Sequence, residues 1–282
     1  MEQKTIEIGS VKISNKLPFA LVCGPCQIES KQHSIDICGA MIEITKELGI
    51  PYIFKASFDK ANRTSISGAR GVGFEKGMET FDEIKKLYNN IPIVTDVHET
   101  HQCAEVAKHV DMLQIPAFLC RQTDLLIAAA KTGKVVNIKK GQFLAPEDMQ
   151  NAVKKCVDNG NDKVCLTERG TSFGYHTLIV DMSGFSIMAK TTGCPVIFDA
   201  THSVQKLGGL GTCSGGNREL APVLARAAIA AGVGGVFLET HENPDKALSD
   251  GPNAIALKDM KAILAYLKEY DALTKAKITD YY

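Results

Sequence analysis

Residues 51–65 read Pro-Tyr-Ile-Phe-Lys-Ala-Ser-Phe-Asp-Lys-Ala-Asn-Arg-Thr-Ser, a short apolar run followed by a strongly polar loop. The run 52–55 has the composition of a buried strand, which places Lys55 at its carboxyl end. Lys60 and Arg63 follow in the same loop, together with an amide and hydroxyl side chains. So much fixed positive charge at the exit of a strand suits a phosphorylated or carboxylated ligand.

The same strand-and-loop unit recurs along the whole chain. Short apolar runs predict strands at 19–24, 52–55, 92–96, 112–115, 135–139, 163–167, 195–199 and 235–239. Apolar residues at helical spacing predict helices after them, at 34–48, 75–88, 99–109, 122–131, 146–159, 177–191, 219–231 and 257–270. Strand–helix units repeated over about 250 residues match an α/β fold, the (β/α)₈ barrel. A doubly wound sheet is the alternative, but the chain has no Gly-x-Gly-x-x-Gly turn.

The barrel is expected to form a single domain over residues 1–282, because no linker-like stretch divides the chain. Residues 5–8 and 11–13 alternate apolar and polar side chains around Gly9-Ser10. This alternation predicts an N-terminal β-hairpin within residues 1–14, ahead of the first barrel strand.

The composition is ordinary for a globular protein, with 45% hydrophobic and 23% charged residues. Lys plus Arg and Asp plus Glu both total 32, so we expect neither nucleic acid nor an anionic membrane as a partner. The amino terminus lacks the apolar core of a signal peptide, and no apolar stretch is long enough to span a bilayer. The nine cysteines are scattered and odd in number, which indicates reduced thiols and a cytoplasmic protein.

In (β/α)₈ barrels the chemistry lies where the strands end. In this chain these positions are all polar or ionisable: Cys26, Lys55, Asp96, Gln114, Lys139, Arg169, His202 and Glu239. A single residue of this kind is usually a solvated loop residue. The complete set predicts one shared site at the mouth of the barrel.

The cations Lys55, Lys60, Lys139 and Arg169 are predicted to converge and to clamp a phosphate and a carboxylate on one small substrate. A Schiff base at Lys55 or Lys139 is the alternative, because neighbouring cations lower the pKa of a lysine. That alternative leaves the second constellation of the site without a role.

The second constellation is Cys26, His202, Glu239 and Asp250. The first, seventh and eighth strands are neighbours in a closed barrel, so these side chains arrive from adjacent strands. One thiolate, one imidazole and two carboxylates predict a divalent metal site, for Zn²⁺, Fe²⁺, Mn²⁺ or Co²⁺ without a choice among them. Other nearby side chains are assigned no role: Cys23, His98, His101 and His241. The glycine-rich segments 206–211 and 214–217 predict a lid over the mouth.

Several segments together resemble the family of 3-deoxy-D-manno-octulosonate 8-phosphate synthases, over essentially the whole chain. These segments are Lys-Ala-Ser-Phe-Asp-Lys-Ala-Asn-Arg at 55–63, Asn-Ile-Lys-Lys-Gly-Gln-Phe at 137–143, Thr-Glu-Arg-Gly at 167–170, Asp-Ala-Thr-His-Ser-Val-Gln at 199–205 and Ser-Asp-Gly-Pro-Asn at 249–253. The run Lys-Ala-Asn-Arg at 60–63 is the most specific, since related 3-deoxy-heptulosonate synthases carry Lys-Pro-Arg-Thr there. Residues 67–70 depart from the bulkier sequence of the family.

The resemblance implies a transferase that condenses phosphoenolpyruvate with arabinose 5-phosphate, usually as a homotetramer, for the inner core of bacterial lipopolysaccharide. It implies that Lys60, Gln114, Lys139 and Arg169 hold phosphoenolpyruvate. The sugar phosphate would be held by Asn62, Arg63 and Thr64, the last of which is more often Ser in the family.

By the same resemblance, Arg121 lies near a subunit boundary, within reach of a neighbour's substrate. Lys60, Asp96, His202 and Asp250 are the candidates for direct participation in the chemistry. Some family members have Asn at the position of Cys26 and work without a metal, so this chain resembles the metal-dependent class. The rivals are a 3-deoxy-heptulosonate synthase that uses erythrose 4-phosphate and a non-enzymatic binding protein built on a barrel.

Overall fold

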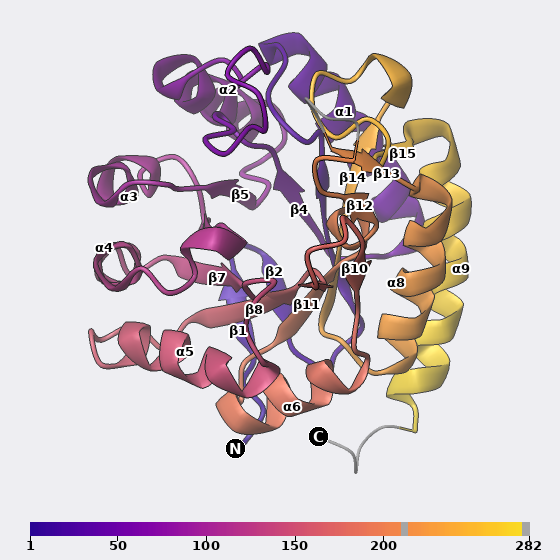
Figure 1. The fold of residues 1–282 in the computed structure, drawn as a ribbon. Helices are drawn as coiled ribbons and strands as arrows, with labels where there is room; N and C mark the ends of the chain where they lie inside the picture. The colour runs from indigo at the N-terminus through magenta and orange to yellow at the C-terminus, as the bar shows by residue number, and fades with distance from the viewer. Residues whose placement is uncertain (210–213, 278–282) are drawn as a thin grey trace.

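The computed structural model describes residues 1–209 and 214–277, and its centre is a closed barrel of parallel strands (Figure 1). The barrel strands are β3 (Ala20–Gly24), β4 (Tyr52–Lys55), β5 (Ile93–Asp96), β6 (Met112–Ile115), β7 (Val135–Lys139), β8 (Val164–Glu168), β11 (Val196–Asp199) and β14 (Gly235–His241). Successive strands pair with one another, and the pairings of β14 with β11 and β3 close the ring. The predicted (β/α)₈ barrel is confirmed.

Helices surround the strands on the outside of the barrel (Figure 1). They are α1 (Lys31–Leu48), α2 (Phe74–Leu87), α3 (Thr100–Val106), α4 (Thr123–Lys131), α5 (Met149–Val157), α6 (Ser183–Thr192), α7 (Ala200–Ser203), α8 (Ala221–Ala230) and α9 (Leu257–Lys275). Short 3₁₀ turns add η1 (Ala117–Leu119), η2 (Pro146–Asp148), η3 (Arg218–Leu220) and η4 (Pro244–Lys246). Among the residues described, no helix is both long and apolar enough to cross a membrane.

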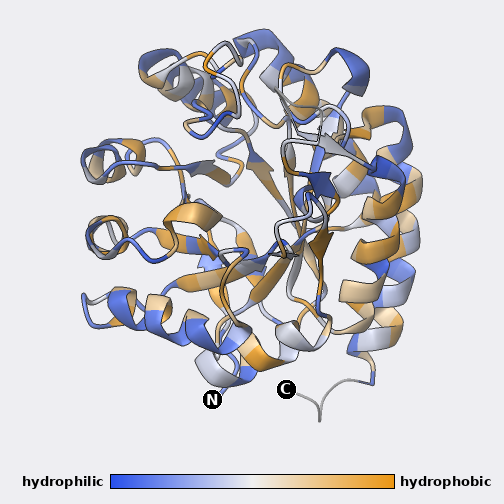
Figure 2. Cartoon of the chain, viewed as in Figure 1, coloured by the Kyte–Doolittle hydropathy of each residue, from blue (hydrophilic) through white to orange (hydrophobic). Residues whose placement is uncertain are grey.

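Two apolar layers hold the barrel together. The larger one lies between the strands and the helices. In Figure 2 hydrophobic residues colour much of the barrel strands and alternate with hydrophilic ones along the helices. The smaller one combines inward-facing residues of the strands with the predicted N-terminal hairpin, β1 (Ile6–Ile8) and β2 (Val11–Ile13). The buried face of this hairpin packs at the amino-terminal end of the barrel, so the opposite end is left to polar side chains.

The structure corrects one predicted element and places the remaining short ones. The helix expected at 177–191 begins only at Ser183, because β10 (Leu178–Ile179) pairs with β9 (Thr171–Ser172) in an antiparallel hairpin. The Asp181 carboxylate accepts the backbone N–H of Ser183 and so marks the true start of α6. The other short strands are β12 (Gln205–Lys206), β13 (Gly215–Gly216) and β15 (Ile255–Ala256). Residues 210–213 of the predicted lid lie outside the described residues.

Candidate active site at the mouth of the barrel

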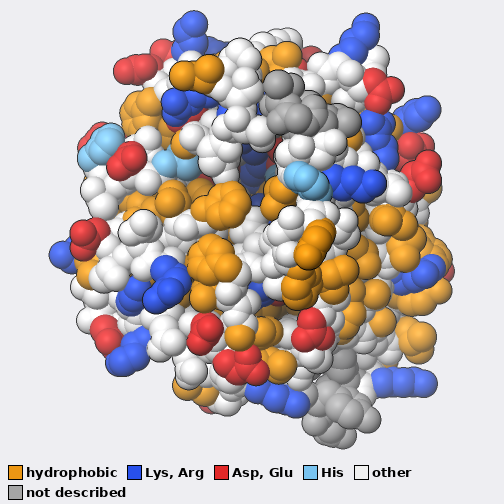
Figure 3. Space-filling view, in the orientation of Figure 1, with side chains coloured by type: hydrophobic (Ala, Val, Ile, Leu, Met, Phe, Trp, Pro, Cys, Tyr) orange, Lys and Arg blue, Asp and Glu red, His pale blue; other side chains and the backbone are white. Residues whose placement is uncertain are grey.

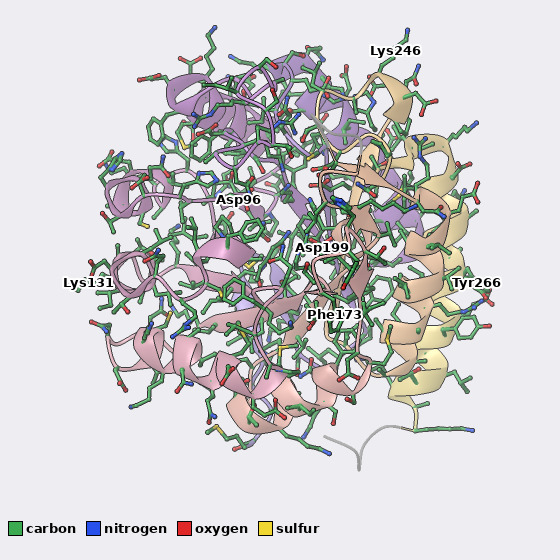
Figure 4. The ribbon with its side chains drawn as sticks, viewed as in Figure 1. Asp96, Lys131, Phe173, Asp199, Lys246 and Tyr266 are labelled. Atoms are coloured by element: carbon green, nitrogen blue, oxygen red, sulfur yellow. The ribbon has the colours of Figure 1, made fainter. Side chains whose placement is uncertain are left out.

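A cleft of about 810 Å³ opens at the carboxyl ends of the strands. Lys and Arg side chains lie at the bottom of this hollow in Figure 3, and Asp96 and Asp199 lie near the middle of Figure 4. Most of the predicted site residues line the cleft: Lys55, Lys60, Asn62, Arg63, Thr64, Asp96, Gln114, Lys139, Arg169, His202 and Asp250. Cys26 and Glu239 are buried behind this lining, whereas Arg121 is exposed outside it.

The predicted constellation of Cys26, His202, Glu239 and Asp250 is assembled. One ligand atom from each side chain lies within 4.8 Å of the other three. Cys26 Sγ is 3.3 Å from Asp250 Oδ2, and His202 Nε2 is 3.5 Å from Glu239 Oε2. In the part of the chain that the structure describes, the buried Oε2 atom of Glu239 has no hydrogen-bond partner, which is a costly arrangement for a carboxylate. This mixed set of sulfur, nitrogen and oxygen atoms therefore fits a divalent metal ion.

Two local main-chain features position Cys26 and Asp250, one for each residue. Strand β3 ends at Gly24, where any Cβ atom would meet the carbonyl oxygen of Lys55 at 2.0 Å, so glycine lets the two strand ends approach. Asp250 has a φ of 51°, a left-handed conformation that Asp tolerates better than most residues. Its Oδ1 atom accepts a hydrogen bond of 2.7 Å from the Gln205 amide, which fixes the direction of Oδ2 toward Cys26.

Asp199 orients the imidazole of His202. It accepts a hydrogen bond of 2.7 Å at Oδ2 from His202 Nδ1, and its Oδ1 accepts the backbone N–H of the same residue at 2.9 Å. With the proton held on Nδ1, the lone pair of Nε2 points at Glu239 and Asp250. Metal-bound histidines usually donate their second ring N–H to a carboxylate, as His202 donates to Asp199 here.

The Cys26 thiol lies in an unfavourable environment for a thiolate. Burial, reinforced by the negative charge of Glu239, raises the pKa of this thiol well above its usual value. A bound cation would reverse that preference, because a coordinating thiol is deprotonated outright. Cys23, at the other end of the Cys-Gly-Pro-Cys segment, is fully buried in the outer apolar layer and is not among the converging ligands.

Lys55 is the counter-ion of Glu239. Its ammonium group is 1% exposed and donates to Glu239 Oε1 at 2.8 Å and to the Cys26 carbonyl at 3.0 Å. Burial would raise the pKa of Glu239, but His202 and Lys55 outweigh it and lower the pKa to about 2. The Lys60 ammonium lies 4.0 Å from the same Oε1 atom. Glu239 is therefore a fully ionised carboxylate with one oxygen left for a further cation.

A hydrogen-bonded bridge joins the cationic side of the cleft to the ligand constellation. Arg169 Nη2 donates to Gln205 Oε1 at 2.6 Å, and the amide of Gln205 reaches Asp250. The other terminal nitrogen of Arg169, Nη1, is buried and has no hydrogen-bond partner among the described residues. Lys139 lies across the same floor, 2.6 Å from Asp199 Oδ2. Arg169 thus presents an unsatisfied charged donor, the feature expected where an anionic group is to be bound.

Asp96 lies on the other side of the cleft and is held by neighbours on both oxygens. Ser57 donates to Oδ2, and the Gln114 amide donates to Oδ1 at 2.5 Å. Burial would raise the pKa of Asp96, but Lys55, Lys60 and Lys139 together hold it well below its usual value. Asp96 is therefore an ionised acceptor facing the lysine-rich part of the cleft.

Loop residues 56–73 form the rim above these groups. Asn62 and Thr64 are exposed, while Arg63 donates to Ser249 Oγ at 2.6 Å and to the Leu248 carbonyl at 3.1 Å. Ser249 Oγ is in turn 3.2 Å from Cys26 Sγ. The rim and the ligand constellation are thereby in direct contact.

Sequence reasoning missed several residues that the structure places at the site. Asp199 and Gln205 orient other side chains, and Ser249 joins Cys26 to the rim. His98, to which no role was assigned, lines the cleft, and burial lowers its pKa. For Asp199 a signal was present, because it ends a strand three residues before His202. Gln205 and Ser249 carry no signal of that kind.

Comparison with known proteins places the chain among relatives of similar length. Residues 2–276 match the model of the DAHP synthetase I family. A 2-dehydro-3-deoxyphosphooctonate aldolase of Rhodopseudomonas palustris (strain BisB5) is 58% identical over 272 residues, which cover 96% of this chain and 94% of that protein. The proteins of the same name from Bradyrhizobium sp. (strain ORS 278) and Nitrobacter hamburgensis are also 58% identical, over 98% and 96% of this chain and 96% and 94% of theirs.

These matches agree with the resemblance that the motifs indicated, and they extend over nearly the whole barrel. The chain belongs to the DAHP synthetase I family.

Proposed function

We propose that this protein condenses phosphoenolpyruvate with arabinose 5-phosphate and water, giving 3-deoxy-D-manno-octulosonate 8-phosphate and phosphate. Relatives that are 58% identical over nearly their full length are named as aldolases of the phosphorylated octonate. The observation that carries the assignment is one cleft that combines buried cations, including an unpartnered Arg169 nitrogen, with an assembled set of metal-type ligands. The product is a precursor for lipopolysaccharide synthesis.

Phosphoenolpyruvate is assigned to the cationic floor of the cleft. Its phosphate and carboxylate need fixed positive charge, which Lys60, Lys139 and Arg169 supply, with Gln114 beside them. Burial opposes the charge of Lys60, but the sulfur of Cys26 and the carboxylates of Glu239, Asp96 and Asp250 raise its pKa. Lys60 is therefore protonated at neutral pH and can stabilise negative charge on the reacting molecule.

Arabinose 5-phosphate is assigned to the rim formed by Asn62, Arg63 and Thr64, with its phosphate at Arg63. Its aldehyde end then faces the floor, where Asp96 offers an ionised acceptor for a substrate hydroxyl group or for the attacking water. Lys55 is assigned to the same cleft, as the group that keeps Glu239 in place.

The reaction follows from the two bound positions. The enol carbon of phosphoenolpyruvate attacks the aldehyde carbon of the open sugar, and water adds to the cationic carbon that results. Loss of phosphate from this hemiketal leaves the 2-keto acid. The clamps contribute by holding the two carbons together, which replaces a bimolecular encounter by one within the complex.

A divalent transition metal is proposed as the cofactor, held by Cys26, His202, Glu239 and Asp250. When bound, it supplies Lewis-acid chemistry, orienting the aldehyde or activating the water. Asp199 fixes the His202 tautomer for this purpose, and Gln205 fixes Asp250. The unpartnered oxygen of Glu239 supports the proposal, because a cation would satisfy it.

Arabinose 5-phosphate is expected to be used far better than erythrose 4-phosphate. The resemblance assigns the sugar-phosphate contacts to the run Lys-Ala-Asn-Arg at 60–63, where heptulosonate synthases carry Lys-Pro-Arg-Thr. The measurement is phosphate release from phosphoenolpyruvate with each aldose phosphate at matched concentrations. Equal or reversed turnover would support the heptulosonate synthase instead, and no turnover with either aldose would favour a binding protein.

Substitution of Arg63 by Ala is expected to raise the KM for arabinose 5-phosphate by about 10- to 100-fold, the cost of one charge-assisted hydrogen bond to a bound group. The KM for phosphoenolpyruvate is expected to change little, because that substrate is held by other residues. The matched control is Arg70→Ala, which removes a cation of the same loop that is paired with Asp59 and exposed. An unchanged KM for the sugar in the Arg63 variant would remove its assignment.

We further propose a homotetramer in the cytoplasm, with Arg121 reaching a neighbour's substrate. Large apolar side chains are exposed on the loops after β6, β7 and β8: Phe118, Phe143, Phe173, Tyr175 and Ile179. Apolar side chains gather beside the hollow in Figure 3, and a patch of this kind marks a protein contact. Arg121, three residues after Phe118, is exposed and lies outside the cleft of its own chain.

The expected result is a tetramer in sedimentation, which Phe143→Glu breaks with a parallel loss of activity; Phe143 is exposed and does not line the cleft. Val223→Glu changes an exposed apolar side chain of α8 and serves as the control. A fully active monomer would contradict both the tetramer and the role of Arg121.

A further inference from the structure

A second cluster of metal-type side chains lies behind the loop that carries Asp250. It consists of Glu29, just before helix α1, His33 in the first turn of that helix, and His241, the last residue of β14. One ligand atom from each lies within 4.8 Å of the other two. The two imidazole rings are 4.7 Å apart between centroids. None of these residues lines the cleft described above.

Two buried ring nitrogens in this cluster, Nδ1 of His33 and Nε2 of His241, have no hydrogen-bond partner within residues 1–209 and 214–277. His241 is 5% exposed, and its Nε2 atom is 3.5 Å from Glu29 Oε1. Buried polar atoms nearly always have a hydrogen-bond partner, so two orphaned nitrogens beside a carboxylate indicate a binding site for a further ligand. A divalent cation would satisfy all three side chains at once.

Glu242 supplies the support that such a site requires. Its Oε2 atom is 2.8 Å from His33 Nε2 and 3.3 Å from His241 Nδ1, the ring nitrogens opposite to the two orphaned ones. If both of those nitrogens donate their protons to Glu242, the two orphaned nitrogens carry lone pairs, and that of His241 Nε2 lies 3.5 Å from Glu29 Oε1. Metal-bound histidines donate their second N–H to a carboxylate in this manner.

One contact has to change for this arrangement. The backbone N–H of Asn243 now donates to His241 Nδ1 at 2.9 Å, which places the ring proton on Nε2. Ligation at Nε2 moves that proton to Nδ1, where Glu242 is the available acceptor. The backbone N–H of Asn243, an exposed residue, then donates to water instead.

We propose that Glu29, His33 and His241 form a second divalent metal site, distinct from the Cys26 constellation, and that Zn²⁺ is a suitable occupant. Two histidines and one glutamate form a common zinc-ligand set, and they leave a position for water. The site joins the first turn of α1 to the end of β14. Glu29 also accepts the backbone N–H of Leu248 at 2.8 Å, two residues before Asp250, so the ion would brace that loop.

The test is the zinc content of the purified protein after equilibration with Zn²⁺ and removal of loosely bound ion. We expect about two equivalents per chain in the parent, about one in His33→Leu, about one in Cys26→Ala and close to none in the double variant. His109→Leu is the matched control, because it removes a surface histidine that is paired with Asp82.

The Cys26→Ala background separates this inference from the proposed function. Zinc that remains in Cys26→Ala and is lost in the double variant supports the second site, even if the Cys26 constellation binds nothing in the parent. Equal zinc content in His33→Leu and the parent would overturn it. His33→Gln, which retains a polar side chain, repeats the measurement if the Leu variant does not fold.

Discussion

Exhaustive chelation is expected to abolish turnover, and an added divalent transition metal is expected to restore it. The physical reason is the environment of the Cys26 constellation. Glu239 is ionised with one unpartnered oxygen, and the Cys26 thiol is disfavoured as a thiolate until a cation is present. Removing the ion leaves buried anionic groups facing one another without the charge that balances them.

Single substitutions are expected to reproduce this loss. Cys26→Ala and His202→Ala should each lower metal content and rate together, by about 100-fold or more in rate, as for loss of a group that stabilises the transition state. Cys23→Ala is the matched control, because Cys23 is also buried, lies three residues before Cys26 and contributes no ligand atom to the cluster. Activity is measured by phosphate release and metal content by elemental analysis. A metal-free preparation with full activity would place the chain in the metal-independent class.

Arg169→Lys is expected to lower kcat/KM for phosphoenolpyruvate by about 100-fold, although the charge is retained. Arginine holds Gln205 with one terminal nitrogen and leaves the other free for the substrate. Lysine has a single ammonium group and cannot occupy both directions from the same backbone position. Asp250 would also lose part of its support, because Gln205 connects it to Arg169.

The control for this substitution is Arg226→Lys on α8, where the guanidinium donates to the Tyr266 hydroxyl. Tyr266 lies at the outer edge of the molecule in Figure 4. Kinetics with each substrate varied in turn distinguish the effects on phosphoenolpyruvate and on the sugar. A loss confined to the KM for the sugar would assign Arg169 to the other substrate. An unchanged kcat/KM would remove it from the anion site.

Much of the site followed from the sequence because a closed barrel converts position along a strand into position in space. Cys26 and His202 follow the first and seventh strands, Glu239 lies near the end of the eighth, and strand order alone makes these strands neighbours. The same argument placed Lys139 and Arg169 at one mouth. Local patterns were weaker where an apolar run is only two residues long, because such a run fits either a helix or a hairpin. Leu178 and Ile179 were wrongly placed in a helix for this reason.

The sequence by itself determined the fold class, the family and the residue types at the strand ends, since these depend on periodicity and on local motifs. Only the tertiary structure decided which side chains touch. It paired Lys55 with Glu239, set Asp199 behind His202, and connected Arg169 to Asp250 through Gln205. Such pairings depend on side-chain direction and on loops whose path no short-range pattern encodes. The same holds for the second cluster, where Glu29 and His241 meet across more than two hundred residues of chain.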